Sequence, residues 1–210
     1  MSAEQNQLNE DRRVSRTKQF ISGALLELLQ EKRIEDIAIK DITERANVNR
    51  STFYAYYSDK FDLLEQMTKA KLGELSRLLI AGNADAAAYL PDFNEPDPFF
   101  SALFDHLEEN EPFYIVLFTR LGPASAANDY PYAMFAVIRD AFYARISSLG
   151  MSQKQAVPLD LLLDHISFST FHSAKKWMEQ RMIYSSRHMA LQLTRLSILG
   201  DYRAMGFVVS

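Results

Sequence analysis

Apolar residues recur every three or four positions over long stretches of this chain, and this periodicity constrains the fold more than any other feature. The clearest example lies between Arg12 and Lys32, where the stripe consists of Ile21, Ala24, Leu25, Leu28 and Leu29. Such spacing places side chains on one face of an α-helix. Turn-forming residues are sparse, with 7 glycines and 7 prolines in 210 residues. No internal repeat and no pair of strands is recognisable, so the pattern predicts an all-α protein.

The same criterion predicts a series of helices joined by short turns. They are expected over residues 12–32, 40–46, 50–57, 60–80, 98–110, 112–121, 131–149, 157–181 and 185–199. Residues 1–11 are polar and are expected to form a disordered tail. The clearest linker is the segment 81–98, which carries three prolines and four acidic residues.

Local sequence signals are expected to fix the ends of the shortest helices. The segment 47–49, Asn-Val-Asn, is predicted to be a tight turn, because asparagine tolerates the left-handed backbone conformation that such turns often require. Either Ser58 or Asp59 is expected to cap the N-terminus of the helix that starts near Lys60.

Composition and motifs exclude several classes of protein. The chain has no cysteine, which excludes disulfides and cysteine-based zinc sites. No apolar run approaches the ~20 residues of a membrane span, and the N-terminal residues lack the apolar region of a signal peptide. We therefore expect a cytoplasmic protein with no membrane partner. The common nucleophile, zinc-protease and nucleotide-binding motifs are absent, so neither an enzyme activity nor a cofactor is expected.

The histidines do not predict a metal site. His165 and His172 share one helix face, with Asp164 nearby. Seven positions separate the two histidines, which is too far along a helix for both side chains to meet one ion. We instead expect one of them to be a polar group in a pocket or at a subunit interface.

The segment 46–60, with the sequence ANVNRSTFYAYYSDK, concentrates aromatic and hydroxyl side chains in one short helix. At about 100° per residue, Phe53 and Tyr57 fall on the same face and are expected to be buried. Small residues lie on the opposite face. Periodicity alone also allows a tyrosine-rich core helix of any helical bundle.

Two short helices joined by a tight turn, roughly residues 45–57, have the geometry of a helix-turn-helix. A face of small residues flanked by longer side chains suits a helix that enters the major groove of double-stranded DNA. We predict that Ser51, Thr52 and Ala55 approach base edges, that Tyr54, Tyr56 and Lys60 contact phosphates, and that Arg50 binds either a guanine or a phosphate.

Charge is unevenly distributed along the chain. The formal net charge is −4, but residues 1–60 hold ten basic and ten acidic residues. A basic cluster lies within this first part at Arg12, Arg13, Arg16 and Lys18. A local patch matters more for contact with phosphates than the total charge. This cluster is either ordinary surface charge or a contact with the DNA backbone or minor groove.

These residues carry a resemblance to a known family. Ile42, Ala46, Val48, Thr52, Phe53, Tyr54, Tyr57, Lys60 and Leu63, at their spacing, resemble the DNA-binding domain of TetR-family bacterial repressors. The pattern of that family is approximately I-x-x-x-A-G-V-S-x-G-T-x-Y-x-x-F-x-x-K-x-x-L. The resemblance covers about residues 12–65. The later segments HLEENEPFYIVLF and FHSAKKWMEQRMIYSSRHMALQL are more loosely similar to the C-terminal part of one subgroup of these regulators.

Several positions depart from the family pattern. Asn47 stands where the family usually has glycine, Asn49 where it has serine, and Ser51 where it has glycine. Ala38 replaces a hydroxyl residue that caps the second helix and touches a phosphate in many family members. We therefore include Lys40 among the predicted DNA contacts, because its side chain can supply a phosphate contact there.

The resemblance implies a three-helix helix-turn-helix domain, at residues 12–58, followed by a helical effector-binding and dimerisation domain at residues 59–210. It implies a homodimer in which the helices expected at 157–181 and 185–199 form a four-helix bundle with their copies. It also implies a small-molecule effector, bound in an apolar pocket. We predict that this pocket is lined by Phe104, Phe118, Phe142, Phe168 and His172.

The sequence thus predicts a sequence-specific DNA-binding transcriptional regulator, in the form of a ligand-responsive repressor that binds a palindromic operator as a dimer. An alternative is a co-activator module that uses the same domain for protein–protein contact, which Ala38 and the neutral charge of residues 1–60 favour. An enzyme on an all-α scaffold is the third and least favoured alternative.

Overall fold

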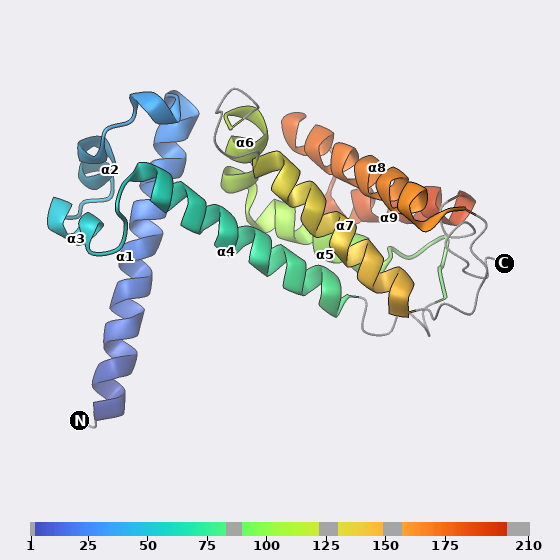
Figure 1. The fold of residues 1–210 in the computed structure, drawn as a ribbon, viewed down its shortest axis with the longest axis horizontal. Helices are drawn as coiled ribbons and strands as arrows, with labels where there is room; N and C mark the ends of the chain where they lie inside the picture. Colours follow the sequence, from blue (N-terminus) through green and yellow to red (C-terminus); the bar gives the residue numbers. More distant parts are fainter. Residues whose placement is uncertain (1–2, 83–89, 122–129, 149–156, 201–210) are drawn as a thin grey trace. The chain divides into compact units, whose positions relative to one another are not determined.

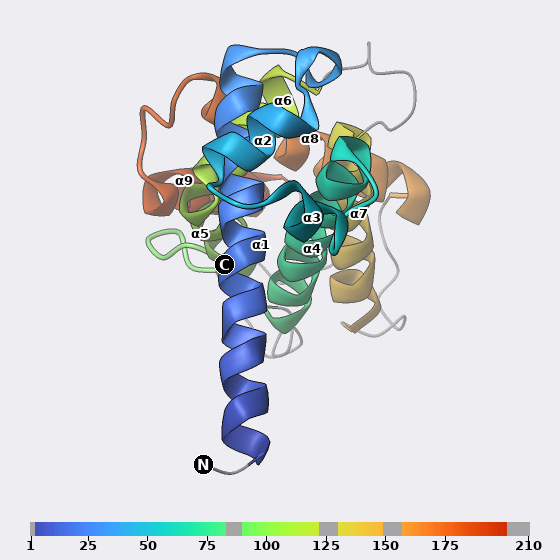
Figure 2. The same ribbon diagram turned by 90° about the vertical axis from the view of Figure 1, so that its left-hand side faces the viewer.

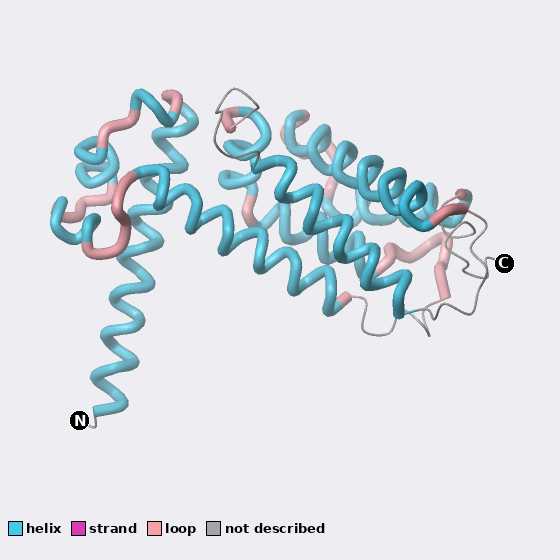
Figure 3. Tube along the Cα trace, viewed as in Figure 1, coloured by secondary structure: helices cyan, strands magenta, loops and turns pink. Residues whose placement is uncertain are grey.

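The computed structural model describes residues 3–82, 90–121, 130–148 and 157–200, with side chains described from Arg12 onward. Across these ranges every regular element is helical (Figures 1 and 3). The elements are α1 (Ala3–Glu31), the 3-10 turn η1 (Ile34–Asp36), α2 (Ile39–Arg45), α3 (Arg50–Tyr54), α4 (Lys60–Ala81), α5 (Pro98–Glu109), α6 (Glu111–Thr119), α7 (Tyr130–Ser148), α8 (Leu159–Glu179) and α9 (Ser186–Leu199). The predicted all-α class is confirmed.

Two helix ends differ from the prediction by three residues or more. Helix α1 begins at Ala3 rather than Arg12, because residues 3–11 contain no glycine or proline and are mostly good helix formers. The disordered tail predicted for residues 1–11 is therefore wrong from Ala3 onward, while residues 1 and 2 lie outside the described ranges. Helix α3 ends at Tyr54 rather than Tyr57, because the amides of Tyr56 and Tyr57 both donate to the Phe53 carbonyl and close the last turn tightly.

The chain forms two compact units, Met1–Ala70 and Lys71–Ser210. We call the first the head and the second the body. Helix α4 runs through the division, so its first turns belong to the head and its last turns to the body. None of the helices in the described ranges is long and apolar enough to span a membrane.

The core of the head lies where α1, α2, α3 and the start of α4 meet (Figure 2). Its fully buried side chains include Ile21, Leu25, Ile42, Phe53 and Leu63. Each of these residues occupies the apolar face of its helix, and α2 and α3 are too short to be stable without this packing. The buried residues of α2 and α3 therefore determine which side chains remain on the outside.

The body is a bundle in which α5 packs on α9, α7 packs on α8, and α6 packs on α8. Aromatic side chains fill much of its interior. The Phe104 ring meets Trp177 edge to face at 5.2 Å between ring centroids, and Phe99 lies 4.4 Å from Phe142. These rings are almost fully excluded from solvent. Large buried rings contribute much of the hydrophobic stabilisation of a bundle of this size.

A buried ion pair joins three parts of the body. The Arg145 guanidinium on α7 donates to both carboxylate oxygens of Asp97, at 2.9 and 2.6 Å. Asp97 also caps α5, because its Oδ1 accepts from the Phe99 amide at 2.7 Å. Its own amide donates to Thr194 Oγ1 on α9 at 2.7 Å. Asp97 thus fixes the start of α5 against α7 through its carboxylate and against α9 through its backbone amide.

Candidate nucleic-acid interface

The turn between α2 and α3 is a Schellman motif built on an asparagine. The Val48 amide donates to the Thr43 carbonyl at 3.0 Å, and the Asn47 amide donates to the Glu44 carbonyl at 3.2 Å. Asn47 has φ of 52°, the left-handed conformation that this motif requires. The predicted tight turn is confirmed, and asparagine satisfies it where the family pattern has glycine. The turn fixes the angle at which α3 leaves α2.

The N-terminus of α2 is only half capped. The Asp41 carboxylate accepts from the Ala38 amide at 3.1 Å, and this backbone hydrogen bond lowers the pKa of Asp41. Ala38 has no side-chain oxygen with which to complete a reciprocal capping box. Lys40, in the first turn of α2, is exposed and its Nζ lies 3.6 Å from a Glu44 carboxylate oxygen.

Helix α3 presents a polar face opposite its buried residues. Phe53 is 0% and Tyr57 is 4% exposed, as the periodicity predicted. Arg50, Ser51, Tyr54 and Ala55 are exposed, whereas Thr52 and Tyr56 are half-buried. Six of the eight residues predicted to contact DNA therefore come from this one short helix and the turn that follows it.

Arg50 and Tyr54 lie one helical turn apart on the surface of α3, and their side chains contact each other. The Arg50 guanidinium lies 5.7 Å from the centroid of the Tyr54 ring, and its Nη2 donates to the Tyr54 hydroxyl at 3.4 Å. The Tyr54 ring in turn meets Phe53 edge to face at 5.6 Å. Through these contacts the buried Phe53 supports Tyr54, and Tyr54 supports Arg50.

The residues after α3 are fixed against α1. The Lys18 ammonium lies over the Tyr56 ring, 5.4 Å from its centroid. Burial raises the pKa of the Tyr57 phenol, and a hydrogen bond with Ser22 opposes that shift. Tyr56 is therefore positioned by a basic side chain of α1, and Lys18 links the basic cluster to the segment after α3.

Lys60 is bound to the backbone of the head. Its Nζ donates to the carbonyls of Glu35 at 2.8 Å and Ile37 at 2.7 Å. Neighbouring side chains cap α4. Asp59 Oδ1 accepts from the amides of Phe61 and Asp62, at 2.8 and 2.9 Å, so Asp59 is the cap residue. The Asp62 carboxylate accepts from the Ser58 amide at 2.8 Å, and this bond lowers the pKa of Asp62.

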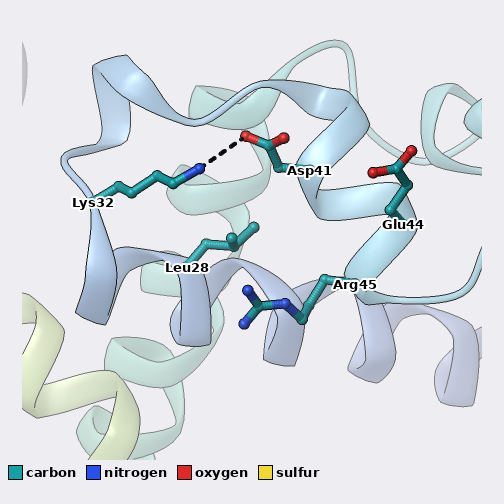
Figure 4. Close-up of a pocket in the computed structure, with 5 residues that line it drawn as sticks. All are labelled: Leu28, Lys32, Asp41, Glu44 and Arg45. Atoms are coloured by element: carbon teal, nitrogen blue, oxygen red, sulfur yellow. Dashed lines mark ion pairs between the residues drawn. The ribbon is translucent and has the colours of Figure 1, made fainter.

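Ion pairs neutralise the basic residues on the α2 side of the head. Lys32 pairs with Asp41 at 3.6 Å, and Arg45 pairs with Glu27 and Glu31 at 3.3 and 3.2 Å. Figure 4 shows this region, a surface groove lined by Leu28, Lys32, Asp41, Glu44 and Arg45. Within the described part of the head, no carboxylate pairs with Arg12, Arg13, Arg16 or Arg50. Residues 1–60 carry equal numbers of basic and acidic residues, but the paired cations lie on the α2 side and these four arginines lie on α1 and α3.

These features define a class of protein. A short amphipathic helix is held at a fixed angle by a tight turn after another short helix, and it exposes small residues flanked by an arginine and tyrosines. This is the geometry of a helix-turn-helix DNA-binding protein, in which the second helix lies in the major groove and the flanking side chains contact the backbone.

Comparison with known proteins supports this assignment. The family described as "Bacterial regulatory proteins, tetR family" matches residues 21–67, and the family described as "Transcriptional regulator C-terminal region" matches residues 94–198. The chain belongs to the TetR family of bacterial transcriptional regulators. It is a DNA-binding regulator, and proteins of this family are not enzymes.

Two curated relatives match parts of the chain. An uncharacterized HTH-type transcriptional regulator, YxbF, of Bacillus subtilis (strain 168) is 41% identical over 66 residues, which are 31% of this chain and 17% of that protein. The HTH-type dhaKLM operon transcriptional activator DhaS of Lactococcus lactis subsp. lactis (strain IL1403) is 30% identical over 102 residues, 49% of each protein. The chain thus spans half or less of the length of these relatives.

A solved structure shares the fold. The transcriptional regulator FadR from Bacillus subtilis, in complex with stearoyl-CoA, superposes with a TM-score of 0.61 at 17% identity, over 85% of this chain and 96% of that one. At this identity the similarity concerns the fold alone.

The five residues predicted to line an effector pocket do not lie together. Phe104, Phe118 and Phe142 are buried in the body, but Phe168 is 63% exposed and stacks on the exposed His172 at 6.1 Å. The core face of α8 lies on the opposite side of that helix from Phe168 and His172. In the single chain, two of the five predicted residues therefore lie on the surface of α8 and the other three lie in the interior of the body.

The structure places Phe168 beside a surface groove that the sequence did not suggest. This groove has a volume of about 690 Å³ and is lined by Tyr132, Phe135, Ala136, Arg139, Asp140, Asp164 and Phe168. An exposed ion pair between Arg139 and Asp164, at 2.9 Å, bridges α7 and α8 along it. The signal for it was a set of aromatic residues on the outer faces of two neighbouring helices.

A polar network inside the body was also missed. His106 is 1% exposed, and its Nε2 lies 3.0 Å from the Tyr114 hydroxyl. The Asn110 side chain donates to the His106 carbonyl at 2.8 Å. Burial lowers the pKa of His106 and raises that of Tyr114. The i, i+4, i+8 spacing of His106, Asn110 and Tyr114 is the sequence signal that could have indicated it.

Proposed function

We propose that the protein is a ligand-responsive repressor that binds a palindromic operator as a homodimer. The observation that carries this proposal is the division of α3 into a buried face and an exposed face. The exposed face combines small residues with Arg50 and Tyr54, whose side chains are already held in place. One such helix covers only a few base pairs, so two copies related by a two-fold axis are needed for a specific site.

The proposed DNA contacts follow from which side chains are exposed and how far each can extend toward bases or phosphates. Ser51, Thr52 and Ala55 approach base edges, and Tyr54 and Tyr56 contact phosphates on either side. Lys40 lies near the start of α2 and contacts a phosphate there, at the expense of its exposed pair with Glu44. Lys60 has three N–H donors and uses two on backbone carbonyls, which leaves one for a phosphate.

Exposed apolar side chains support dimerisation through α8 and α9. Leu161 and Phe168 on α8 are 60% and 63% exposed, and Leu196 and Leu199 on α9 are 64% and 71% exposed. Such residues on two helices at one end of the chain are typical of a surface that another subunit covers. We infer that the two helices form a four-helix bundle with their copies.

An effector would act through its difference in affinity for two conformations of the dimer. Helix α4 is the proposed lever, because it begins at Lys60 in the head and ends at Ala81 in the body. The same fold holds stearoyl-CoA in FadR from Bacillus subtilis, which supports an apolar small molecule as the class of effector. Bacterial promoters lie in the cytoplasm, which is the expected location.

Binding to the DNA upstream of its own gene tests the proposal. The purified protein should protect a palindrome there, and raising the salt concentration should weaken binding steeply as counterions are taken up again. Apolar acids and their thioesters should then be screened for release of the DNA. Weak binding that is insensitive to sequence and to salt would instead favour the co-activator alternative, in which the head contacts another protein.

A second candidate function is activation rather than repression. DhaS, a relative at 30% identity over 102 residues, is an activator. Measuring transcripts of the operator-linked genes after deletion of this gene distinguishes the two. Increased transcription indicates a repressor, and decreased transcription indicates an activator.

A further inference from the structure

We propose that Arg50 determines operator sequence by binding a guanine in each half-site through its major-groove edge. This inference rests on the proposed operator binding and specifies the base that the protein requires.

The first support is that the other basic side chains around the helix-turn-helix are already bound to acceptors within the protein. Residues 32–60 contain six lysines and arginines. Four pair with carboxylates, namely Lys32, Arg33, Lys40 and Arg45, and Lys60 is bound to two carbonyls. Within this fully described stretch, Arg50 is the cation that binds neither a carboxylate nor a backbone carbonyl. Its guanidinium is therefore available to a ligand without breaking an ion pair.

The second support is the position of Arg50 at the start of α3. It is the first residue of that helix, and the N-terminal residues of a recognition helix are those that contact base edges. Its exposed neighbours Ser51 and Ala55 are small. They leave room for the helix to approach the floor of the groove, so that a long side chain beside them reaches the bases.

The third support is the orientation of the guanidinium. The Tyr54 hydroxyl accepts one N–H of Arg50 at 3.4 Å, and the Tyr54 ring lies alongside at 5.7 Å. Four of the five N–H donors of the guanidinium remain. A side chain that is already held in one arrangement loses less conformational entropy on binding. Lysine, a single flexible ammonium, cannot reproduce this geometry.

The chemistry of the group selects guanine over the other bases. Guanine presents two acceptors, O6 and N7, side by side in the major groove. Adenine presents one acceptor next to a donor, and a guanidinium has no acceptor with which to meet that donor. Among the four bases, therefore, only guanine offers the Arg50 guanidinium two parallel hydrogen bonds in the major groove.

Atomic substitution in the operator tests this proposal. Each guanine of the bound palindrome is replaced in turn, in both half-sites, by 7-deazaguanine, which carries C–H in place of N7. Affinity is measured by fluorescence anisotropy for the wild type, Arg50→Ala, Arg50→Lys and the control Lys40→Ala. At one symmetric pair of guanines we expect the wild type and Lys40→Ala to lose about 10- to 100-fold in affinity. Arg50→Ala should be insensitive to the substitution at that position, and Arg50→Lys, whose ammonium is a single flexible donor group, should lose less affinity than the wild type.

Two results would overturn the inference. If Arg50→Ala weakens binding to all duplexes equally and keeps the wild-type response to every 7-deazaguanine, Arg50 holds a phosphate and not a base. If the wild type binds the palindrome but no guanine N7 matters, guanine is not the base it recognises. Failure of the wild type to bind any upstream duplex would overturn the operator proposal itself and, with it, this inference.

Discussion

The carboxylate of Asp97 and the guanidinium of Arg145 show how strongly single residues stabilise the body. Both side chains are almost fully excluded from solvent, and two hydrogen bonds of 2.9 and 2.6 Å join them. Removing one member of a buried pair leaves the other charged and desolvated, at a cost of about 3–5 kcal/mol. By contrast, an ion pair on the surface remains hydrated when one partner is lost.

We predict that Arg145→Met lowers the free energy of unfolding by about 3–5 kcal/mol, measured by urea denaturation followed by circular dichroism. The matched control is Asp164→Asn, which removes the exposed pair with Arg139 and should change stability far less. A loss for Arg145→Met no larger than that of the control would show that the buried pair does not organise the body.

His106 makes stability depend on pH in the acid range. Burial lowers its pKa in the folded protein below the ordinary 6.5, and the Glu74 and Glu109 carboxylates oppose this shift without cancelling it. Below that ordinary value the unfolded chain takes up a proton that the folded protein does not, so acid favours unfolding. The contribution of His106 is fully present above the unfolded pKa and is lost as the pH falls.

The prediction is that His106→Gln flattens the decline of unfolding free energy as the pH is lowered from neutrality. The control His188→Gln, which alters an exposed side chain stacked on Tyr184, should retain the wild-type decline. Parallel pH profiles for all three proteins would contradict the assignment to His106.

At the scale of elements, the turn between α2 and α3 sets the angle of the recognition helix. Asn47 occupies the left-handed conformation at φ of 52°, which costs about 1–2 kcal/mol for most residues and nothing for glycine. We predict that Asn47→Ala lowers the free energy of unfolding of the head by about 1–2 kcal/mol, whereas Asn47→Gly retains or increases it. The measurement is thermal unfolding of the full chain, with Asn49→Ala as the control at a position with φ of −72°. Equal effects at 47 and 49 would contradict the role of the turn.

Sequence periodicity predicted the positions of the helices well. It predicted the burial or exposure of some site residues and not of others. The burial of Phe53 and Tyr57 and the exposure of Ser51, Tyr54 and Ala55 follow from spacing along one helix. The bonds from Lys60 to carbonyls of residues 35 and 37 depend on tertiary packing, which no local pattern encodes. The exposure of Phe168 was not predicted, because an aromatic residue in an amphipathic helix usually belongs to the hydrophobic core. The pairing of Asp97 with Arg145 joins positions too far apart in the sequence for periodicity to connect.

At the scale of the whole molecule, the central question is how two heads are held together. The proposed dimer buries Phe168 of α8 and Leu196 of α9, which are 63% and 64% exposed in the single chain. We predict that Phe168→Glu combined with Leu196→Glu shifts the protein from a dimer to a monomer of 24.1 kDa in analytical ultracentrifugation. Tyr143→Glu, at an exposed residue of α7, is the control and should leave the dimer intact. A double variant that remains dimeric would place the interface elsewhere.

The measurement that tests the central claim most directly is binding of the palindrome upstream of the gene by Tyr54→Ala and by Tyr143→Ala. Both substitutions remove an exposed tyrosine, 47% exposed on α3 and 53% exposed on α7. If α3 is the recognition helix, Tyr54→Ala should lose about 10-fold or more in affinity, because it removes a phosphate contact and the support of Arg50. Tyr143→Ala should bind like the wild type. Equal affinity of the two variants would show that α3 does not contact the operator.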